Sequence, residues 1–263
     1  MLKILVIRPL ILLTLTFSVL PSHASAQSVE REYLPFGEAK LRRFPLKRTE
    51  LTREEIMSEQ GVNISGVRIR EEVDEPPPSA AAAPRNTEEE DEVERSLVFS
   101  GRDLEGQEWR IKIDRAVYYE AAYEGDIDRN GVRDVVLSIG TGGNGLAPPT
   151  QLIFLTFDRR GRPALFEATG YFEAQANNIF DVADMDGDGR AELLFMSYGD
   201  GYWITNLYRV RESRWSRVEG RFAGLSFPLY TRFTSRPNHR PVRPARGRNP
   251  VAPDLLKENK VID

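Results

Sequence analysis

The chain has 263 residues, with 36 Lys and Arg against 40 Asp and Glu, two histidines and no cysteine. A formal charge of −4 is only mildly acidic and says little about partners. The absence of cysteine excludes a disulfide framework, so packing or a bound metal must stabilise the fold. One histidine, His23, lies near the N-terminus and the other, His239, lies in a Pro/Arg-rich tail. These positions argue against histidine-based nucleophilic chemistry and histidine-ligated zinc.

The N-terminus has the pattern of a secretory signal peptide. Lys3 and Arg8 precede an apolar run over residues 10–20, and small residues ending at Ala26 follow. The run is too short and too interrupted by proline for a transmembrane helix, which needs about 20 apolar residues. We therefore predict that residues 1–26 are a signal peptide cleaved after Ala26. The mature chain is then a bacterial protein without a membrane span, secreted or periplasmic.

Residues 27–74 form a polar region with one clear element, a short helix. Thr52 is a suitable N-cap, Glu55 closes a capping box, and Gly61 is a suitable end. The region has too few apolar residues to predict an independent domain. The sequence leaves open whether it packs on the rest of the chain.

Residues 75–95 change sharply in composition, with a proline run, an alanine-rich stretch and an acidic run over residues 88–92. Proline stiffens such a segment and like charges extend it. We therefore predict a solvated linker rather than an acidic binding tail.

The pattern of residues 96–235 indicates an all-β domain. It begins with a β-hairpin over residues 97–113, and two units follow at about residues 116–172 and 178–222. Each unit is expected to have four strands, with an acidic loop between the first and the second. The predicted strands of the two units are residues 117–123, 134–139, 151–157 and 164–171, then 178–183, 191–198, 202–210 and 215–222.

The strands that follow the acidic loops are apolar at nearly every position, which predicts that both of their faces are covered. By contrast, residues 202–208 mix polar and aromatic side chains, as a partly exposed strand would. A further strand is predicted at residues 226–233, where Pro228 confines it to an edge. Residues 236–263 form a basic, proline-rich tail that we predict to be disordered. No aromatic platform accompanies its arginines, so nucleic acid is disfavoured as a partner.

The two acidic loops share a register in which oxygen-bearing side chains alternate and glycine stands sixth. Alternate positions of a tight turn can aim their oxygens at one centre, and calcium takes about 6 to 8 oxygen ligands. Glycine at the sixth position, Gly131 or Gly189, adopts backbone angles that cost other residues more. We predict a calcium site in each loop, with the seventh residue contributing its backbone carbonyl. The predicted ligands are Asp126, Asp128, Asn130, Val132 and Asp134 in the first loop, and Asp184, Asp186, Asp188, Arg190 and Glu192 in the second.

Asn130 replaces an acid, which makes the first loop the weaker predicted site. Neither loop is an EF-hand, because the twelfth position, which must supply a bidentate acid, is Leu137 or Phe195. Acids at positions one, three, five and nine, set between strands and repeated, resemble the FG-GAP/VCBS repeat of integrin-type β-propellers. That resemblance implies blade-like four-stranded units with calcium in each loop. A propeller needs at least about four blades to close. We therefore expect two such units plus a hairpin in an open β-domain, not a closed propeller, flanked by disordered segments.

The resemblance implies a non-catalytic adhesion or ligand-binding module, whose partner is a protein or carbohydrate at the cell surface or in the periplasm. The calcium ions are then structural, and the functional surface is expected on the loops at residues 140–149 and 198–203.

Two alternatives stay open at this point. A carbohydrate-active enzyme would need two carboxylates, for which Glu167 or Glu173 beside a cleft formed by Tyr202 and Trp203 are the candidates. An accessory subunit of an envelope complex would use the linker and the basic tail as tethers.

Overall fold

The computed structural model describes residues 42–73, 95–114, 118–140, 149–172, 174, 176–232, 240–248 and 250–258. The predicted signal peptide and nearly all of the predicted linker lie outside these residues. Within them, nearly all regular structure is β-strand in antiparallel sheets, and no barrel is closed. The all-β prediction is confirmed at that level. No helix in the described part of the chain is long and apolar enough to cross a membrane.

The first sheet has the strand order β3–β4–β5–β6, with neighbouring strands antiparallel. The predicted hairpin is β5 and β6, which therefore belong to a four-stranded sheet. β4 pairs directly with β5 although residues 74–94 separate them in the sequence, so the predicted linker connects two adjacent strands instead of two domains. The strands are β3 (Val62–Ile64), β4 (Val67–Val73), β5 (Arg95–Arg102) and β6 (Glu108–Asp114).

The middle sheet contains the first predicted unit as four consecutive antiparallel strands, β7 to β10. Strand β2, from the N-terminal region, pairs with β7 and extends the sheet at that edge. The first acidic loop connects β7 with β8, as predicted. The strands are β2 (Lys47–Glu50), β7 (Tyr118–Gly125), β8 (Asp134–Gly140), β9 (Thr150–Phe157) and β10 (Pro163–Gly170).

The third sheet contains most of the second predicted unit as β11 to β14, with the second acidic loop between β11 and β12. The strand predicted at residues 178–183 begins only at Val182, and the one predicted at residues 215–222 is divided between β14 and β15. β1 pairs with β11, and β17 pairs with β13. A hairpin of β15 and β16 follows, so the strand predicted at residues 226–233 is divided between β16 and β17. The strands are β1 (Arg42–Arg43), β11 (Val182–Asp184), β12 (Glu192–Gly199), β13 (Tyr202–Arg211), β14 (Arg214–Val218), β15 (Gly220–Phe222), β16 (Leu225–Phe227) and β17 (Leu229–Arg232).

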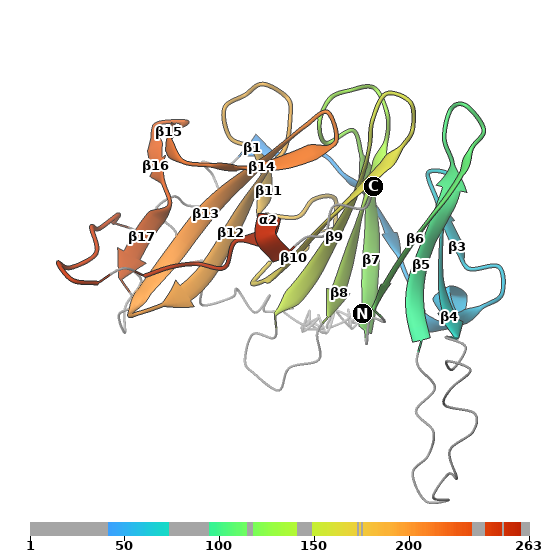
Figure 1. The fold of residues 1–263 in the computed structure, drawn as a ribbon, viewed down its shortest axis with the longest axis horizontal. Coiled ribbons are helices and arrows are strands. Elements are labelled where there is room, and N and C mark those ends of the chain that lie inside the picture. The colour runs from blue at the N-terminus through green and yellow to red at the C-terminus, as the bar shows by residue number, and fades with distance from the viewer. Residues whose placement is uncertain are drawn as a thin grey trace, which may run out of the picture.

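The three sheets stand side by side, and both acidic loops lie at the same end of the molecule (Figure 1). The N-terminal region is integral to this arrangement, since β1 and β2 pair with two different sheets. The predicted capping box is confirmed: Glu55 N donates to Thr52 Oγ1 and Thr52 N donates to Glu55 Oε2. Helix α1 (Arg53–Met57) buries Ile56 but ends before the predicted Gly61.

Apolar side chains fill the two spaces between the sheets. Phe99 and Leu137 belong to the cluster between the first and middle sheets, and Phe154 and Tyr208 to the cluster between the middle and third sheets. Strand β8 is buried up to its last residue and β12 is buried from Glu192 to Met196, which confirms that both faces are covered next to the acidic loops. By contrast, Tyr198 near the end of β12 is exposed.

The outer faces of the two end sheets differ. On the third sheet, Trp203 and Leu207 belong to an apolar cluster completed by Phe227 and Leu229, from β16 and β17. On the first sheet, β4 places charged residues at alternate positions, among them Arg68, opposite its buried apolar positions. The outer face of the third sheet is therefore covered by the β16–β17 segment, and the outer face of the first sheet carries charged side chains.

The prediction that residues 202–208 are partly exposed is wrong, because β13 is buried throughout that range. One face packs on the β16–β17 segment. The opposite face is covered by residues 240–258, which we name the C-terminal strap. Tyr202 and Ile204 form a small apolar cluster with Ala252 of the strap.

The prediction of a disordered tail is also wrong for the described residues of the C-terminal strap. Ala245 N donates to Tyr202 Oη at 3.0 Å, and Leu255 N donates to Tyr208 Oη at 3.2 Å. Leu255, which opens the short helix α2 (Leu255–Glu258), is only 1% exposed and joins the core between the middle and third sheets. A few apolar residues spaced among prolines and arginines are enough to fix the strap, although they form no regular sequence pattern.

Leu255→Ala should lower the free energy of unfolding by about 2–5 kcal/mol, as expected when a buried leucine leaves a cavity. The matched control is Leu256→Ala at a 37%-exposed neighbour, for which we expect a change within about 0.5 kcal/mol. Urea denaturation followed by tryptophan fluorescence measures both. Equal effects of the two substitutions would contradict the packing of the strap.

Candidate metal centre

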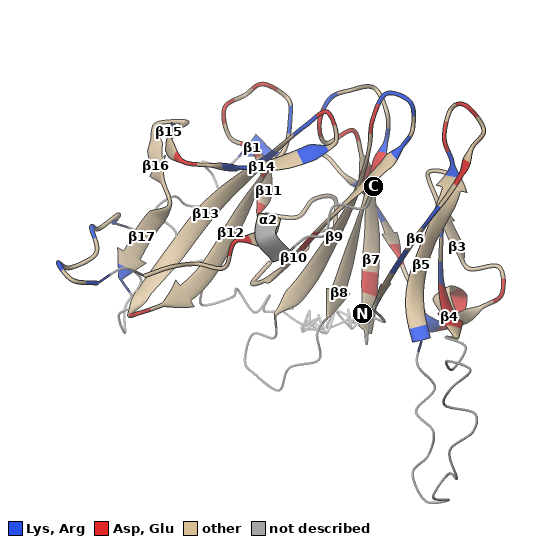
Figure 2. Cartoon of the chain, in the orientation of Figure 1, with Lys and Arg blue, Asp and Glu red and all other residues tan. Residues whose placement is uncertain are grey.

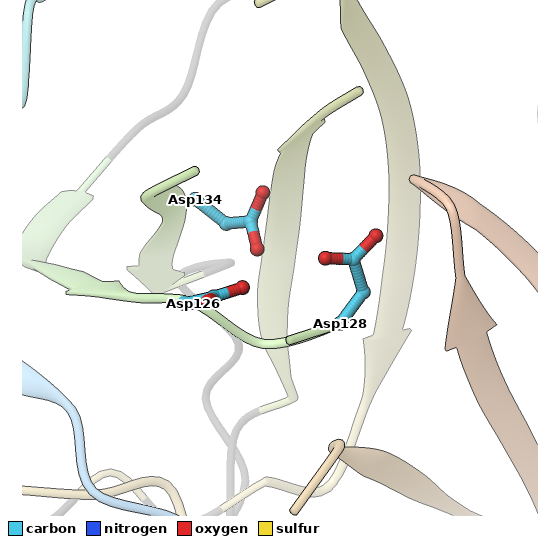
Figure 3. Close-up of side chains that lie close together, drawn as sticks. All are labelled: Asp126, Asp128 and Asp134. Carbon is cyan, nitrogen blue, oxygen red and sulfur yellow. The ribbon is translucent and has the colours of Figure 1, made fainter. Parts of the chain in front are cut away.

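The first acidic loop brings together the carboxylates of Asp126, Asp128 and Asp134. One oxygen from each lies within 4.8 Å of the others, and Figure 3 shows the three groups turned toward a common centre. Asp126 shapes the turn, since its two oxygens accept hydrogen bonds from the backbone N–H groups of Asn130 and Gly131, each at 2.9 Å. Three of the predicted ligands therefore converge.

Asn130 is placed beside this cluster but makes other bonds. Its side-chain nitrogen donates to Asp128 Oδ2 at 3.1 Å and to the carbonyl of Phe157 at 2.5 Å. Its Oδ1 accepts from the backbone N–H of Val132 at 2.7 Å. Asn130 thus ties the loop to the end of β9, a contact that no local sequence pattern predicts.

Asp134 is fully buried, and its carboxylate is bound only by backbone N–H groups within the described residues. Oδ2 accepts from Ile127 N at 2.9 Å and Oδ1 accepts from Phe157 N at 2.8 Å. The pKa of Asp134 is raised to about 8, chiefly by burial, with a smaller rise from the neighbouring Asp128 and Asp126 and with the two hydrogen bonds acting in the opposite direction. Burial also raises the pKa of Asp128. The cluster therefore brings three carboxyl groups together where charge is poorly solvated, and burial favours the protonated form of Asp134 and Asp128 when no cation is bound.

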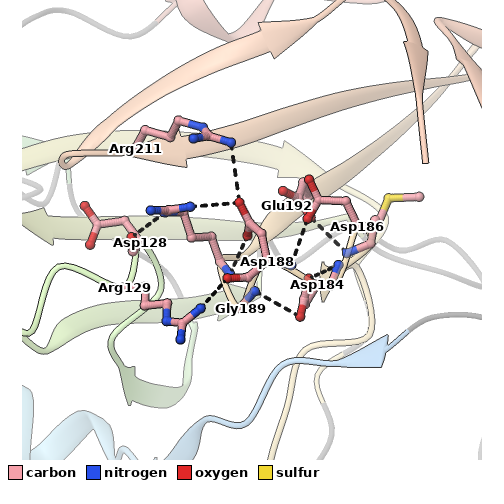
Figure 4. Close-up of polar contacts among 11 residues, drawn as sticks. Asp128, Arg129, Asp184, Asp186, Asp188, Gly189, Glu192 and Arg211 are labelled. Atoms are coloured by element: carbon pink, nitrogen blue, oxygen red, sulfur yellow. Dashed lines mark hydrogen bonds and ion pairs between the residues drawn. The ribbon is translucent and has the colours of Figure 1, made fainter.

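The second loop brings together Asp184, Asp186 and Asp188, again with one oxygen from each within 4.8 Å of the others. Asp184 accepts from the N–H groups of Gly187 at 2.7 Å and Gly189 at 3.2 Å (Figure 4). The first position of each loop therefore organises the turn in a similar way.

Glu192 is 2% exposed and lies at the ninth position, outside the group of three carboxylates that the second loop brings together. Its Oε2 accepts from Met185 N at 2.9 Å. Burial raises its pKa to about 7. Its hydrogen bond repeats the bond between the ninth and second residues that Asp134 makes in the first loop.

The two loops also share a backbone conformation. The sixth residues, Gly131 and Gly189, have φ of 93° and 82°, as predicted for glycine there. The fourth residues, Arg129 and Gly187, also have positive φ, 58° and 83°. This second requirement was missed from the sequence, because arginine carries no signal for it. The agreement position by position indicates one loop design used twice.

Contacts cross from each loop to the other (Figure 4). Arg129 of the first loop donates to the carbonyl of Asp188 at 2.6 Å. In the opposite direction, Arg190 Nε of the second loop donates to the carbonyl of Asp128 at 3.1 Å. A backbone bond from Ala191 N to the carbonyl of Ile127, at 2.8 Å, lies between them. The loops are therefore one connected structure.

Charge is distributed unequally between the loops. Arg190 and Arg211 form ion pairs with Asp188 at 2.9 and 3.4 Å, and Arg42 pairs with Asp184 at 3.3 Å. Although burial raises the pKa of Asp188, hydrogen bonds and charge from the two arginines outweigh burial and hold it below its usual value. Among the described residues, no such ion pair reaches the three carboxylates of the first loop.

The β13–β14 turn is a part of the site that sequence reasoning missed. Ser213 N donates to Asp128 Oδ2 at 2.6 Å, and Arg211 reaches Asp188 from the same turn. Neither residue belongs to a motif. The turn reaches the loops only because the middle and third sheets pack against each other.

The residues considered for an enzyme do not form the expected cleft. Tyr202 and Trp203 are each only 6% exposed. Glu167 accepts a hydrogen bond from Gln151 at 2.7 Å, and Glu173 lies outside the described residues. The predicted aromatic-lined cleft is therefore wrong at these two aromatic positions.

The fold and the loops define a class: an all-β protein of open antiparallel sheets with two acidic clusters that could hold metal ions. Comparison of the chain with protein-family models, with curated proteins and with solved structures finds no match. Function must therefore be argued from the residues of the loops themselves.

In the presence of a chelator, the free energy of unfolding should fall as the pH rises from about 4 to about 8. The pKa of Asp134 is raised from 3.8 to about 8 on folding, so between these values the folded state holds the proton that the unfolded state has lost. Urea denaturation across this pH range measures the slope.

Asp134→Asn should flatten this slope, and Glu219→Gln, at a 75%-exposed acid, should leave it unchanged. An asparagine side chain at this position would bind the two backbone N–H groups less well and would lower the stability at every pH. The readout is therefore the change of stability with pH, not the absolute stability. An identical slope in the wild-type protein and in Asp134→Asn would show that Asp134 is ionised in the metal-free fold.

Proposed function

We propose that this chain is an exported, calcium-binding β-repeat protein that acts as a non-catalytic adhesion or ligand-binding module. The observation that carries the proposal is the agreement of the two loops, which use the same register, the same positive-φ positions and the same bond from the second N–H to the ninth acid. On this shared backbone frame, the carboxylates that converge are those at positions one, three and nine in the first loop and at positions one, three and five in the second.

The donor set favours a hard cation such as calcium over zinc or copper. The converging side chains offer carboxylate oxygens only, and the chain has no cysteine and only two histidines. Hard oxygen ligands suit calcium, whereas zinc and copper sites use nitrogen or sulfur. A divalent cation would also stabilise the ionised forms of the buried Asp128 and Asp134, which no described arginine or lysine pairs with.

In this proposal, calcium serves the fold. Asn130 and the backbone carbonyls of Val132 and Arg190 would complete the coordination shells, and Glu192 would close the second one. The repeats would be blade-like units of the FG-GAP/VCBS kind, supported by their four consecutive antiparallel strands. A protein or carbohydrate at the cell surface or in the periplasm would be the partner.

The arginines around the second loop reverse the order of affinity expected from the sequence. Asp188 already has two cationic partners and Asp184 has one, so a calcium ion there must compete with them. The first loop faces no such competition among the described residues. We therefore propose the first loop as the tighter site despite Asn130.

Calcium should raise the midpoint of thermal unfolding relative to chelated protein. A ligand at 100 times its dissociation constant adds about 2.7 kcal/mol, which corresponds to about 5–10 °C for a protein of this size. Differential scanning calorimetry of the mature chain, with calcium and with a chelator, measures the shift.

The double variant Asp126→Asn/Asp128→Asn should lose most of this shift, and Glu219→Gln should keep it. Magnesium at the same concentration is the control for a general ionic effect. An identical midpoint with calcium and with chelator would contradict the proposal.

Arg211→Gln should tighten calcium binding at the second loop by about twofold to fivefold. Arg211 contacts Asp188 at 3.4 Å from an exposed position, and exposed pairs of this kind are worth about 0–1 kcal/mol. Titration calorimetry of this variant in the Asp126→Asn/Asp128→Asn background isolates the second loop. Weaker binding than in that background alone would show that Arg211 supports the site instead of competing for it.

A further inference from the structure

A groove of about 670 Å³ lies on the first sheet, which carries neither acidic loop. Its arginines come from three adjacent strands, Arg68 from β4, Arg102 from β5 and Arg110 from β6. The register places Ser100 of β5 between Arg68 and Arg110. Figure 2 shows basic positions on β5 and β6 of this sheet. The remaining lining residues are Gly66, Gly101, Glu108 and Trp109.

The groove is positively charged in a chain whose formal charge is −4, since its lining has three arginines and one acid. Arg68 Nε donates to the carbonyl of Gln60 at 2.7 Å, and its Nη2 donates to the carbonyl of Glu59. These carbonyls orient the guanidinium group without neutralising its charge. Arg68 therefore presents an oriented cation that no described carboxylate pairs with.

The other two arginines already bind carboxylates. Arg102 pairs with Glu108 at 2.7 Å, where the side chains are 71% and 74% exposed. Arg110 pairs with Glu72, which it shares with Arg70. Exposed pairs contribute little to stability. A carboxylate of the ligand could therefore take the place of Glu108 beside Arg102, in the position that the Glu108 carboxylate now occupies.

We propose that this groove binds a carboxylated polysaccharide, that is, a sugar chain with uronic acid units. Arginine forks match carboxylates in a bidentate fashion. Strands lie about 4.7–4.9 Å apart, so the three arginines meet carboxylates repeated along a chain better than they meet a single small anion. The hydroxyl of Ser100 is available to the hydroxyl groups of the sugars. This inference rests on the ligand-binding half of the proposed function and names its ligand class.

The position of the groove favours this ligand over other polyanions. It lies on a sheet face at β5, whose backbone is paired on both sides with β4 and β6, so an acidic peptide gains no main-chain pairing there. No described aromatic side chain in the lining is exposed for base stacking, as single-stranded nucleic acid requires.

Titration calorimetry of the mature chain in calcium tests the proposal with oligogalacturonate as the probe. We expect binding that weakens with added sodium chloride, and no binding of an uncharged oligoglucoside of the same length. Arg68→Gln and Arg110→Gln should each weaken binding about tenfold, and Arg214→Gln, an exposed arginine on the third sheet, should change it less than twofold. Thermal unfolding of each variant verifies that the fold is intact.

Equal affinity of wild type, Arg68→Gln and Arg110→Gln would overturn the proposal. It would also be overturned by binding to phosphatidylglycerol vesicles or polyglutamate without binding to oligogalacturonate. The calcium proposal is tested separately by the thermal shift with chelator. If the protein binds oligogalacturonate but calcium does not shift its thermal unfolding, the groove proposal stands and the calcium proposal fails.

Discussion

The structure depends on carboxylates buried where the middle and third sheets meet. Asp134 is 0% exposed and Glu192 is 2% exposed, and a buried carboxylate is costly unless hydrogen bonds or opposite charge compensate it. The fold supplies backbone N–H groups in both loops and arginines in the second loop. No described arginine or lysine pairs with the carboxyl groups of the first loop, and Asp134 holds a proton near neutral pH instead. A bound cation could replace that proton, which is the physical reason to look for a cation there.

The same junction explains how the sheets hold their relative position. Arg129 and Arg190 cross between the loops in opposite directions, and Ser213 joins the β13–β14 turn to Asp128. Away from the loops, the C-terminal strap inserts Leu255 into the core between the same two sheets. The acidic loops and the strap thus fasten one interface at separate points, and the groove on the first sheet stays free of both.

The parts of the fold that the sequence predicted well are local ones. The strands next to the acidic loops, the hairpin of β5 and β6 and the capping box at Thr52 each depend on residues close together in the chain. For the site, the predicted alternation placed Asp126, Asp128 and Asp134 together. It did not show that Asn130 bonds to Phe157, because that partner lies on another strand.

The sequence by itself determined the two loops, because alternating carboxylates, a sixth glycine and a following apolar strand act within about ten residues of one another. Only the tertiary structure decided that residues 42–73 complete the sheets, that β13 is buried and that the strap packs over it. It also decided which arginines face which carboxylates. These outcomes depend on contacts between segments far apart in the chain, where short-range periodicity carries no information about the partner.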